Sequence, residues 1–200
     1  MYMDNLKDKI VLITGAGKGS GRLLAKAFAK RGAIIAANDI SPINVENVVE
    51  EINQQGGHAK AYIEDVAKKV GVQNLVNQVE DDFSRIDVLI NHAAVEPNVP
   101  LLNMDEWDWH RVLDVNLTGA FLMTQSTGRV MRQQGGGVII NLVTTDQDSA
   151  KSEAAYIASM KGLEAFTHQA ARELSPHGIH VYAVENTGDT IIASVFALFE

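Results

Sequence analysis

Short apolar segments alternate with longer stretches of helical periodicity along almost the whole chain. The apolar segments are typical of buried strands and cover residues 9–14, 33–39, 58–63, 88–91, 138–144 and 179–184. Between them, apolar positions recur every three or four residues and predict helices at 20–31, 43–55, 70–84, 106–133 and 152–174. Strands separated by such helices pair in parallel through right-handed crossovers. The pattern therefore predicts an α/β fold, a Rossmann-like, doubly wound parallel β-sheet with helices on both faces.

Length and composition narrow the class of protein. With 200 residues and no repeat or proline-rich linker, we expect one domain over residues 1–200, of which 1–8 form a short N-terminal extension. The net charge of −8 argues against a nucleic-acid partner, which requires clustered Lys and Arg. The lack of cysteine suits a cytoplasmic location. The apolar run 191–199 is too short for a membrane-spanning helix, so we expect a buried or partner-covered tail and no membrane partner.

The most informative segment is the glycine-rich stretch 14–21, which joins the first strand to the first helix. Glycine allows a tight backbone path and lets a pyrophosphate approach the main chain. The start of the helix adds unpaired N–H groups and the positive end of the helix dipole. A structural turn is the alternative interpretation. The segment predicts a dinucleotide site whose cofactor contacts include Gly15, Lys18, Gly19, Ser20 and Gly21.

Asp39 ends the second predicted strand, at the spacing after the glycine turn expected of a carboxylate that binds the adenosine ribose. A carboxylate at this position accepts hydrogen bonds from both ribose hydroxyls of NAD and repels the 2′-phosphate of NADP. Lys18 is either a partner for that phosphate or a solvated loop lysine. We therefore expect NAD as the preferred cofactor.

Further motifs, taken with these, resemble the short-chain dehydrogenase/reductase family over most of residues 6–185. The family's TGxxxGxG matches residues 14–21, and its acidic residue after the second strand matches Asp39. The resemblance implies an NAD(P)-dependent oxidoreductase that transfers hydride between nicotinamide and an alcohol or carbonyl substrate. The positions after the third and fourth strands that match the family's cofactor site are Asp65, Val66, Asn91, His92 and Ala93. His92 replaces an asparagine and is interpreted as structural.

The resemblance also assigns catalytic roles. Tyr156 matches the family's acid–base tyrosine, and Asn116 matches the residue that anchors a water-linked proton path. The family places a lysine four residues after the tyrosine to favour the phenolate. Here Met160 occupies that position and Lys161 follows it. Because one helical residue turns by about 100°, Lys161 serves only if an irregularity in the helix brings it back, and is otherwise a surface lysine.

The serine that orients the substrate oxygen in the family has no unique counterpart. Alignment from the strand gives Thr144, whose hydroxyl can donate to a carbonyl oxygen, and counting back from the tyrosine gives Val143, which cannot. Thr145 is a lesser candidate. Strand propensity alone would also explain the threonines. The family's Pro-Gly after the sixth strand is replaced by 185–190. The sequence ends at Glu200, short of a typical member, so we expect no seventh strand and a divergent tail at 186–200.

Two functions remain open at this stage. One is an NAD-linked alcohol dehydrogenase or carbonyl reductase acting on a small molecule. The other is a family member that holds a dinucleotide with little or no catalysis, as a sensor, scaffold or subunit. The six histidines lack ligand spacing, so no metal site is expected. We expect a homodimer that pairs through the helices at 106–133 and 152–174, as family members commonly do.

Overall fold

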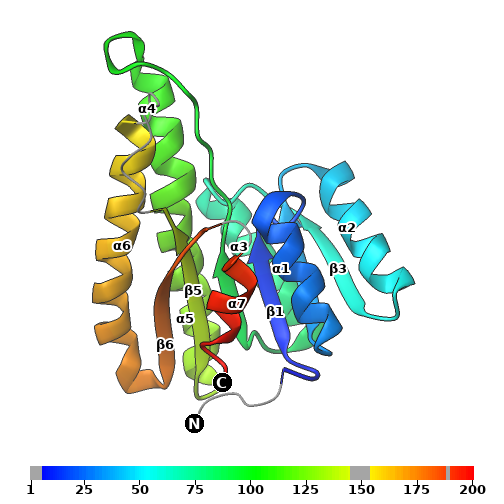
Figure 1. Cartoon of the computed structure of the whole chain (residues 1–200). Helices are drawn as coiled ribbons and strands as arrows, with labels where there is room; N and C mark the ends of the chain where they lie inside the picture. The colour runs from blue at the N-terminus through cyan, green and yellow to red at the C-terminus, as the bar shows by residue number, and fades with distance from the viewer. Residues whose placement is uncertain (1–5, 145–153, 188–189) are drawn as a thin grey trace.

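The computed structural model describes residues 6–144, 154–187 and 190–200. Their strands form one parallel sheet in the order β3-β2-β1-β4-β5-β6 (Figure 1). The strands are β1 Ile10–Thr14, β2 Ile34–Asp39, β3 His58–Ile63, β4 Val88–Asn91, β5 Gly137–Val143 and β6 Ile179–Glu185. The order reverses between β1 and β4, which is the place where an open α/β sheet binds its ligand. The predicted Rossmann-like doubly wound fold is confirmed.

Helices cover both faces of the sheet (Figure 1). One apolar core joins the sheet to α1 (Gly19–Lys30), α2 (Pro42–Gln54) and α7 (Ile191–Phe196). A second core joins the opposite face to α3 (Lys69–Phe83), α5 (Ala120–Gln133) and α6 (Ala154–Leu174). Successive residues of β1 serve the two cores in turn, since Val11 belongs to the first and Leu12 to the second. This double burial explains why the central strands are continuous apolar runs.

The long helix predicted at 106–133 is interrupted. It consists of α4 (Glu106–Leu113), a π-helical segment η2 (Asp114–Gly119) and α5. A π-helical turn holds one residue more than an α-helical turn and often marks a functional site. Apolar periodicity does not reveal one extra residue in a turn, which is why the prediction gave a single regular helix. The segment contains Asn116, one of the predicted catalytic residues.

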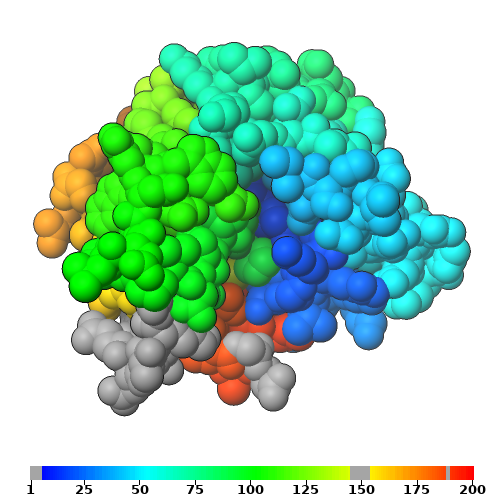
Figure 2. Space-filling model, turned by 90° about the horizontal axis from the view of Figure 1, so that it is seen from above, coloured from blue at the N-terminus to red at the C-terminus, as the bar shows by residue number. Residues whose placement is uncertain are grey.

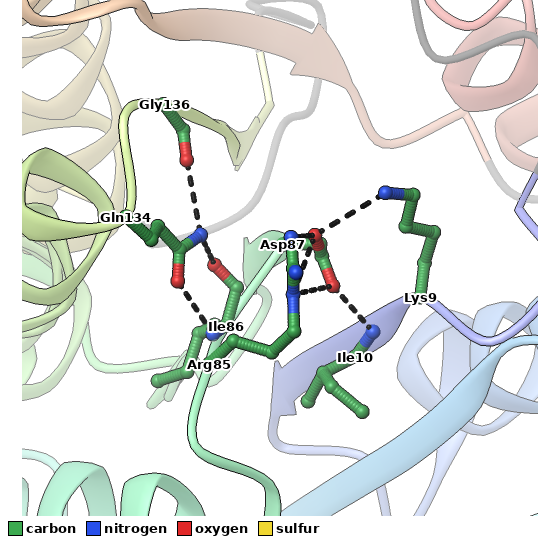
Figure 3. Close-up of polar contacts among 7 residues, drawn as sticks. All are labelled: Lys9, Ile10, Arg85, Ile86, Asp87, Gln134 and Gly136. Atoms are coloured by element: carbon green, nitrogen blue, oxygen red, sulfur yellow. Dashed lines mark hydrogen bonds and ion pairs between the residues drawn. The ribbon is translucent and has the colours of Figure 1, made fainter.

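Polar contacts close the amino edge of the sheet (Figure 3). The buried Asp87 carboxylate accepts from the backbone N–H of Ile10 at 2.9 Å and forms ion pairs with Arg85 and Lys9. Gln134, which follows α5, bonds both the N–H and the carbonyl of Ile86. These contacts fix the start of β4 against β1 and β5, and they lie at the edge opposite the predicted cofactor site.

The apolar tail packs on the first helix. Phe196 lies 4.7 Å from Phe28 between ring centroids, and the Arg31 guanidinium stacks over the Phe196 ring. Phe199 also meets Phe28, edge to face. The predicted burial of this segment is confirmed, and within the described residues β6 is an edge strand with no seventh strand beside it. No helix of the described part of the chain is long and apolar enough to cross a membrane.

Candidate active site

The glycine loop between β1 and α1 has a backbone that larger residues would not fit. Gly15 and Gly19 adopt positive φ angles of 65° and 56°. A Cβ on Gly15 would approach the Ala93 Cα to 2.8 Å, and one on Gly21 would approach the Gly15 carbonyl oxygen to 2.5 Å. The first-turn N–H groups of α1 have no intrahelical partners, and Lys18 at the N-cap supplies no side-chain bond. The loop therefore presents N–H donors on a closely packed backbone, as an anionic diphosphate requires.

Asp39 is buried at the end of β2 and held from both sides. Its Oδ2 accepts from the N–H of Gly17 at 3.0 Å, and its Oδ1 accepts from the N–H of Ser41 at 2.9 Å. Each carboxylate oxygen has a further lone pair for a ligand hydroxyl. The side chain is thus fixed in place and still able to accept hydrogen bonds from a ribose.

A cleft of about 660 Å³ lies at the carboxyl edge of the sheet. Figure 2 shows it as a hollow with the region of α4 on one side, and the glycine loop and the end of β2 on the other. Its size suits an extended dinucleotide moiety bound by apolar walls and a few polar groups. The predicted cofactor residues that line it are Gly15, Lys18, Asp39, Asp65, Val66, His92 and Ala93. The residues present therefore fit the nucleotide that the sequence implies.

The segment after β4 is tied to the glycine loop. Thr14 Oγ1 accepts from the N–H groups of His92 and Ala93 at 3.1 and 3.2 Å. The His92 ring also bonds the glycine loop, through Gly15 and Gly21. Burial lowers the pKa of His92. The loop and the end of β4 thus form one unit at the floor of the cleft.

Two of the predicted cofactor residues, Asp65 and Asn91, form hydrogen bonds within the protein. Asp65 Oδ1 accepts from the N–H of Ala67 and shapes the turn before α3 while lining the cleft. The Asn91 amide is buried and donates to Asn141 on β5 at 2.8 Å, and Asn141 donates to Thr167 on α6. The structure therefore places the Asn91 side chain in the core beneath the site, where it fixes β4 against β5, rather than in the lining of the cleft.

The two predicted hydroxyl residues of the reacting half lie together. Thr144 Oγ1 is 2.9 Å from the Tyr156 hydroxyl, so α6 and the end of β5 bring them into hydrogen-bond contact. Val143 is 3% exposed and packs in an apolar cluster with Ala120 and Leu163. Of the alternatives, Thr144 is therefore the residue beside the tyrosine, and Thr145 lies outside the described residues.

Asn116 braces the tyrosine helix. Its Oδ1 accepts from the N–H of Val95 at 2.8 Å, and its Nδ2 donates to the Val95 carbonyl and to Ser159 Oγ. Ser159 in turn donates to the Tyr156 carbonyl at 2.7 Å. Because Val95 lines the cleft, this chain of bonds joins the cleft wall to the helix that carries Tyr156.

The lysine departs from the family's geometry. Met160, one turn after Tyr156, is 3% exposed. The Lys161 ammonium is 2.9 Å from Glu164 on the same helix and is partly exposed. This ion pair lowers the pKa of Glu164. The structure thus gives Lys161 a carboxylate partner on α6 and gives the position beside the tyrosine an uncharged side chain.

Sequence reasoning missed several residues at the site. One of them is Asn186, whose Oδ1 accepts from the hydroxyl of the predicted residue Ser20 at 2.8 Å and so joins the segment after β6 to the glycine loop. Trp107, Arg111 and Ile40 line the cleft. The position of Asn186 just beyond a strand end was a usable signal, because ligands bind at that edge. No pattern in the sequence indicates that α4 reaches the cleft.

Comparison with known proteins identifies the family of this chain. The sequence profile of the short chain dehydrogenase family matches residues 9–190, and the chain belongs to that family. A 3-oxoacyl-[acyl-carrier-protein] reductase of Synechocystis sp. is 38% identical over 184 residues, which cover 91% of this chain and 74% of the relative. The protein is accordingly an NAD(P)-dependent oxidoreductase of the short-chain type.

Solved structures are similar over nearly the same region. An NAD⁺-bound xylitol dehydrogenase superposes with a TM-score of 0.85 at 32% identity, covering 90% of this chain and 70% of that one. A gluconate 5-dehydrogenase from Burkholderia cenocepacia, in complex with NADP and tartrate, has a TM-score of 0.85 at 29% identity and covers 92% and 72%. Both forms of the cofactor thus occur among the similar structures.

Proposed function

We propose that the protein is an NAD-preferring dehydrogenase or reductase of small alcohols and carbonyls, with Tyr156 as acid–base and Thr144 as the group that orients the substrate oxygen. The observation that carries this proposal is the 2.9 Å contact between the two hydroxyls. Carbonyl reduction requires two groups from the protein. One hydroxyl holds the carbonyl oxygen, and a second donates the proton that this oxygen gains.

The proposed chemistry assigns one task to each group. In reduction, Thr144 donates a hydrogen bond to the carbonyl oxygen and the Tyr156 hydroxyl delivers the proton that this oxygen gains. In oxidation, the phenolate accepts that proton. The nicotinamide, when bound, supplies or accepts the hydride at the substrate carbon. A free tyrosine has a pKa of about 10, and uncharged Met160 contributes nothing to lower it, so we expect slow alcohol oxidation near neutral pH.

The preference for NAD rests on Asp39. Its fixed carboxylate supports two hydrogen bonds from the ribose and an unfavourable charge interaction with a 2′-phosphate. Calorimetric titration with NAD and with NADP tests the preference. Equal or tighter binding of NADP would overturn it.

The proposed activity is tested by NADH oxidation with a panel of aldehydes and ketones. Tyr156→Phe should abolish the rate and leave NAD binding intact, because the phenyl ring keeps the packing and loses only the hydroxyl that transfers the proton. An unchanged rate would contradict the assignment of Tyr156. A rate that is zero for the unaltered protein as well, with normal NAD binding, would favour the second candidate, a dinucleotide-binding protein without catalysis. The observation that favours this second candidate is that the buried, uncharged Met160 occupies the family's lysine position.

We also propose a homodimer that pairs through α5 and α6. Phe121 on α5 is 39% exposed and meets Phe166 of α6 edge to face at 5.9 Å. A second cavity of about 420 Å³ is lined by residues of these helices, among them Arg129 and Glu173, and such opposite charges can pair between two copies related by a two-fold axis. Sedimentation of the protein and of Phe121→Glu tests the pairing. A monomer at all concentrations would reject it. A cytoplasmic location stays a prediction from the sequence.

A further inference from the structure

His92 lies where the two ends of the glycine loop come together, and its ring contacts both ends. Nδ1 is 3.0 Å from the carbonyl oxygen of Gly15, and the backbone N–H of Gly21 donates to Nε2 over 3.2 Å. A Cβ on Gly21 would approach Nδ1 to 2.6 Å, so the ring packs closely on the loop. The imidazole therefore closes the turn that presents the N–H groups of the proposed diphosphate site.

These two contacts define the protonation state of the ring. A backbone N–H only donates and a backbone carbonyl only accepts. Gly21 thus requires an Nε2 without a proton, and Gly15 requires a proton on Nδ1. The neutral Nδ1–H tautomer satisfies both partners. An imidazolium carries a proton on each nitrogen, and its Nε2–H would face the N–H of Gly21.

We propose that His92 is a positioning residue that makes dinucleotide binding dependent on pH. The neutral ring holds the glycine loop in its binding shape, and a proton gained at Nε2 releases Gly21 and weakens binding. This inference rests on the proposed dinucleotide site and adds to it a dependence of binding on pH. Asparagine, the family's residue at this position, does not titrate and would not provide that dependence.

The electrostatic surroundings agree with a neutral ring. Burial lowers the pKa of His92, against bonds to Gly15 and Thr14 that raise it. Among the described residues, the charged side chains that act on the ring are Asp39 at the end of β2, which raises its pKa, and Lys18 in the loop, which lowers it. The net direction is downward, so the closed loop excludes the proton at neutral pH.

The sign of the effect follows from linkage. In a released loop the ring regains its ordinary pKa of about 6.5, above that of the closed loop. The released form then binds the proton more readily, and falling pH favours it. The titration of His92 therefore leaves binding independent of pH well above about pH 6.5, weakens it as the pH falls below that value, and changes it by at most about tenfold per pH unit.

The experiment is calorimetric titration of the whole chain with NAD between about pH 7.5 and about pH 5.5, a range in which the nicotinamide nucleotide does not titrate and histidine does. His92→Asn keeps a donor and an acceptor at the loop and removes the titration. His58→Asn is the matched control, because His58 is an exposed histidine at the start of β3 and is not in the lining of the cleft. We expect the unaltered protein and His58→Asn to bind about three- to tenfold more weakly at the lower pH, and His92→Asn to change less than twofold.

The outcomes separate this inference from the function on which it rests. Absence of NAD binding at about pH 7.5 overturns the proposed function and this inference with it. Binding by the unaltered protein that is independent of pH, or that His92→Asn leaves equally dependent on pH, overturns this inference alone. Tighter binding at low pH also overturns it, because that result means attraction of the imidazolium to the diphosphate.

A second measurement needs neither variant nor nucleotide. A long-range proton–nitrogen correlation spectrum of the free protein reads which ring nitrogen of His92 carries the proton. We expect the Nδ1–H tautomer above about pH 7. The Nε2–H tautomer would contradict the two backbone contacts and overturn the proposal.

Discussion

The Thr144 and Tyr156 hydroxyls are 2.9 Å apart, although the two residues come from different elements, the end of β5 and the start of α6. The separation leaves either oxygen free to donate to the other. A substrate oxygen within hydrogen-bond distance of both could accept a bond from each. The reacting half of the site therefore retains its hydroxyl pair, although Met160 occupies the position one turn after the tyrosine where the family has a lysine.

Replacing Thr144 tests the orienting role. Thr144→Val keeps the shape of the side chain and removes the donor, so we expect kcat to fall by about 100-fold. Thr144→Ser restores a hydroxyl and should keep the rate within about threefold. Steady-state kinetics of carbonyl reduction measure both, with NAD affinity as the control. Equal rates for the valine and serine variants would contradict the role.

Met160→Lys tests whether the missing charge limits the rate. A cation one turn after Tyr156 lowers a phenol pKa by about 1–3 units, and we expect at least a tenfold higher rate of alcohol oxidation near neutral pH. The buried position makes the variant less stable, which a thermal scan will show. The matched control is Lys161→Met, which removes the cation paired with Glu164 and should leave the rate unchanged. A large loss in the control would mean that Lys161 already serves the site.

Asp39→Asn tests the cofactor preference. The variant loses the negative charge and replaces one acceptor oxygen by a donor amide, so it mismatches Gly17 or Ser41. We expect NAD binding to weaken about tenfold and NADP binding to tighten, since the repulsion of the 2′-phosphate disappears. Asp65→Asn, the other carboxylate in the cleft with a backbone bond of its own, should leave the ratio of the two affinities unchanged. If Asp65→Asn changed the ratio of NAD to NADP affinity by the same amount, the assignment of the cofactor preference to Asp39 would be contradicted.

Asp87→Ala tests the contacts at the amino edge of the sheet. The variant leaves the buried N–H of Ile10 without its acceptor, and we expect the free energy of unfolding to fall by about 2 kcal/mol. Arg85→Ala removes a half-exposed partner and should cost less than about 1 kcal/mol. Urea unfolding measures both. Comparable losses would show that the ion pair, rather than the bond to Ile10, stabilises this edge.

Much of the fold could be predicted because local and global signals agree. The doubly buried strands appear as apolar runs, and the strand ends mark the ligand edge, so the sequence could predict Gly15 and Asp39 as site residues and Thr144 as one alternative. The hydroxyl pair was predicted only as two candidates from separate motifs, since nothing in a linear pattern fixes the distance between β5 and α6.

The features that the sequence did not predict all depend on three-dimensional hydrogen bonding, which a linear pattern does not display. The extra residue in the π-helical segment around Asn116 leaves no trace in apolar periodicity, and it is visible only as a change of backbone hydrogen bonding. The bonds from His92 to Gly15 and Gly21 depend on how the loop closes, which side-chain type alone does not dictate. Asn91 matched the family's cofactor motif, yet its amide faces Asn141, because adjacent strands offer a buried partner that a sequence motif does not display.

The bond that the Ile10 N–H donates to Asp87 has a consequence for redesign of the protein. The contacts of Asp87 lie at the rim of the sheet opposite the proposed site, so a substitution in the site leaves them intact. The reactive rim can therefore be altered, as in Met160→Lys, while this brace between β1 and β4 is kept.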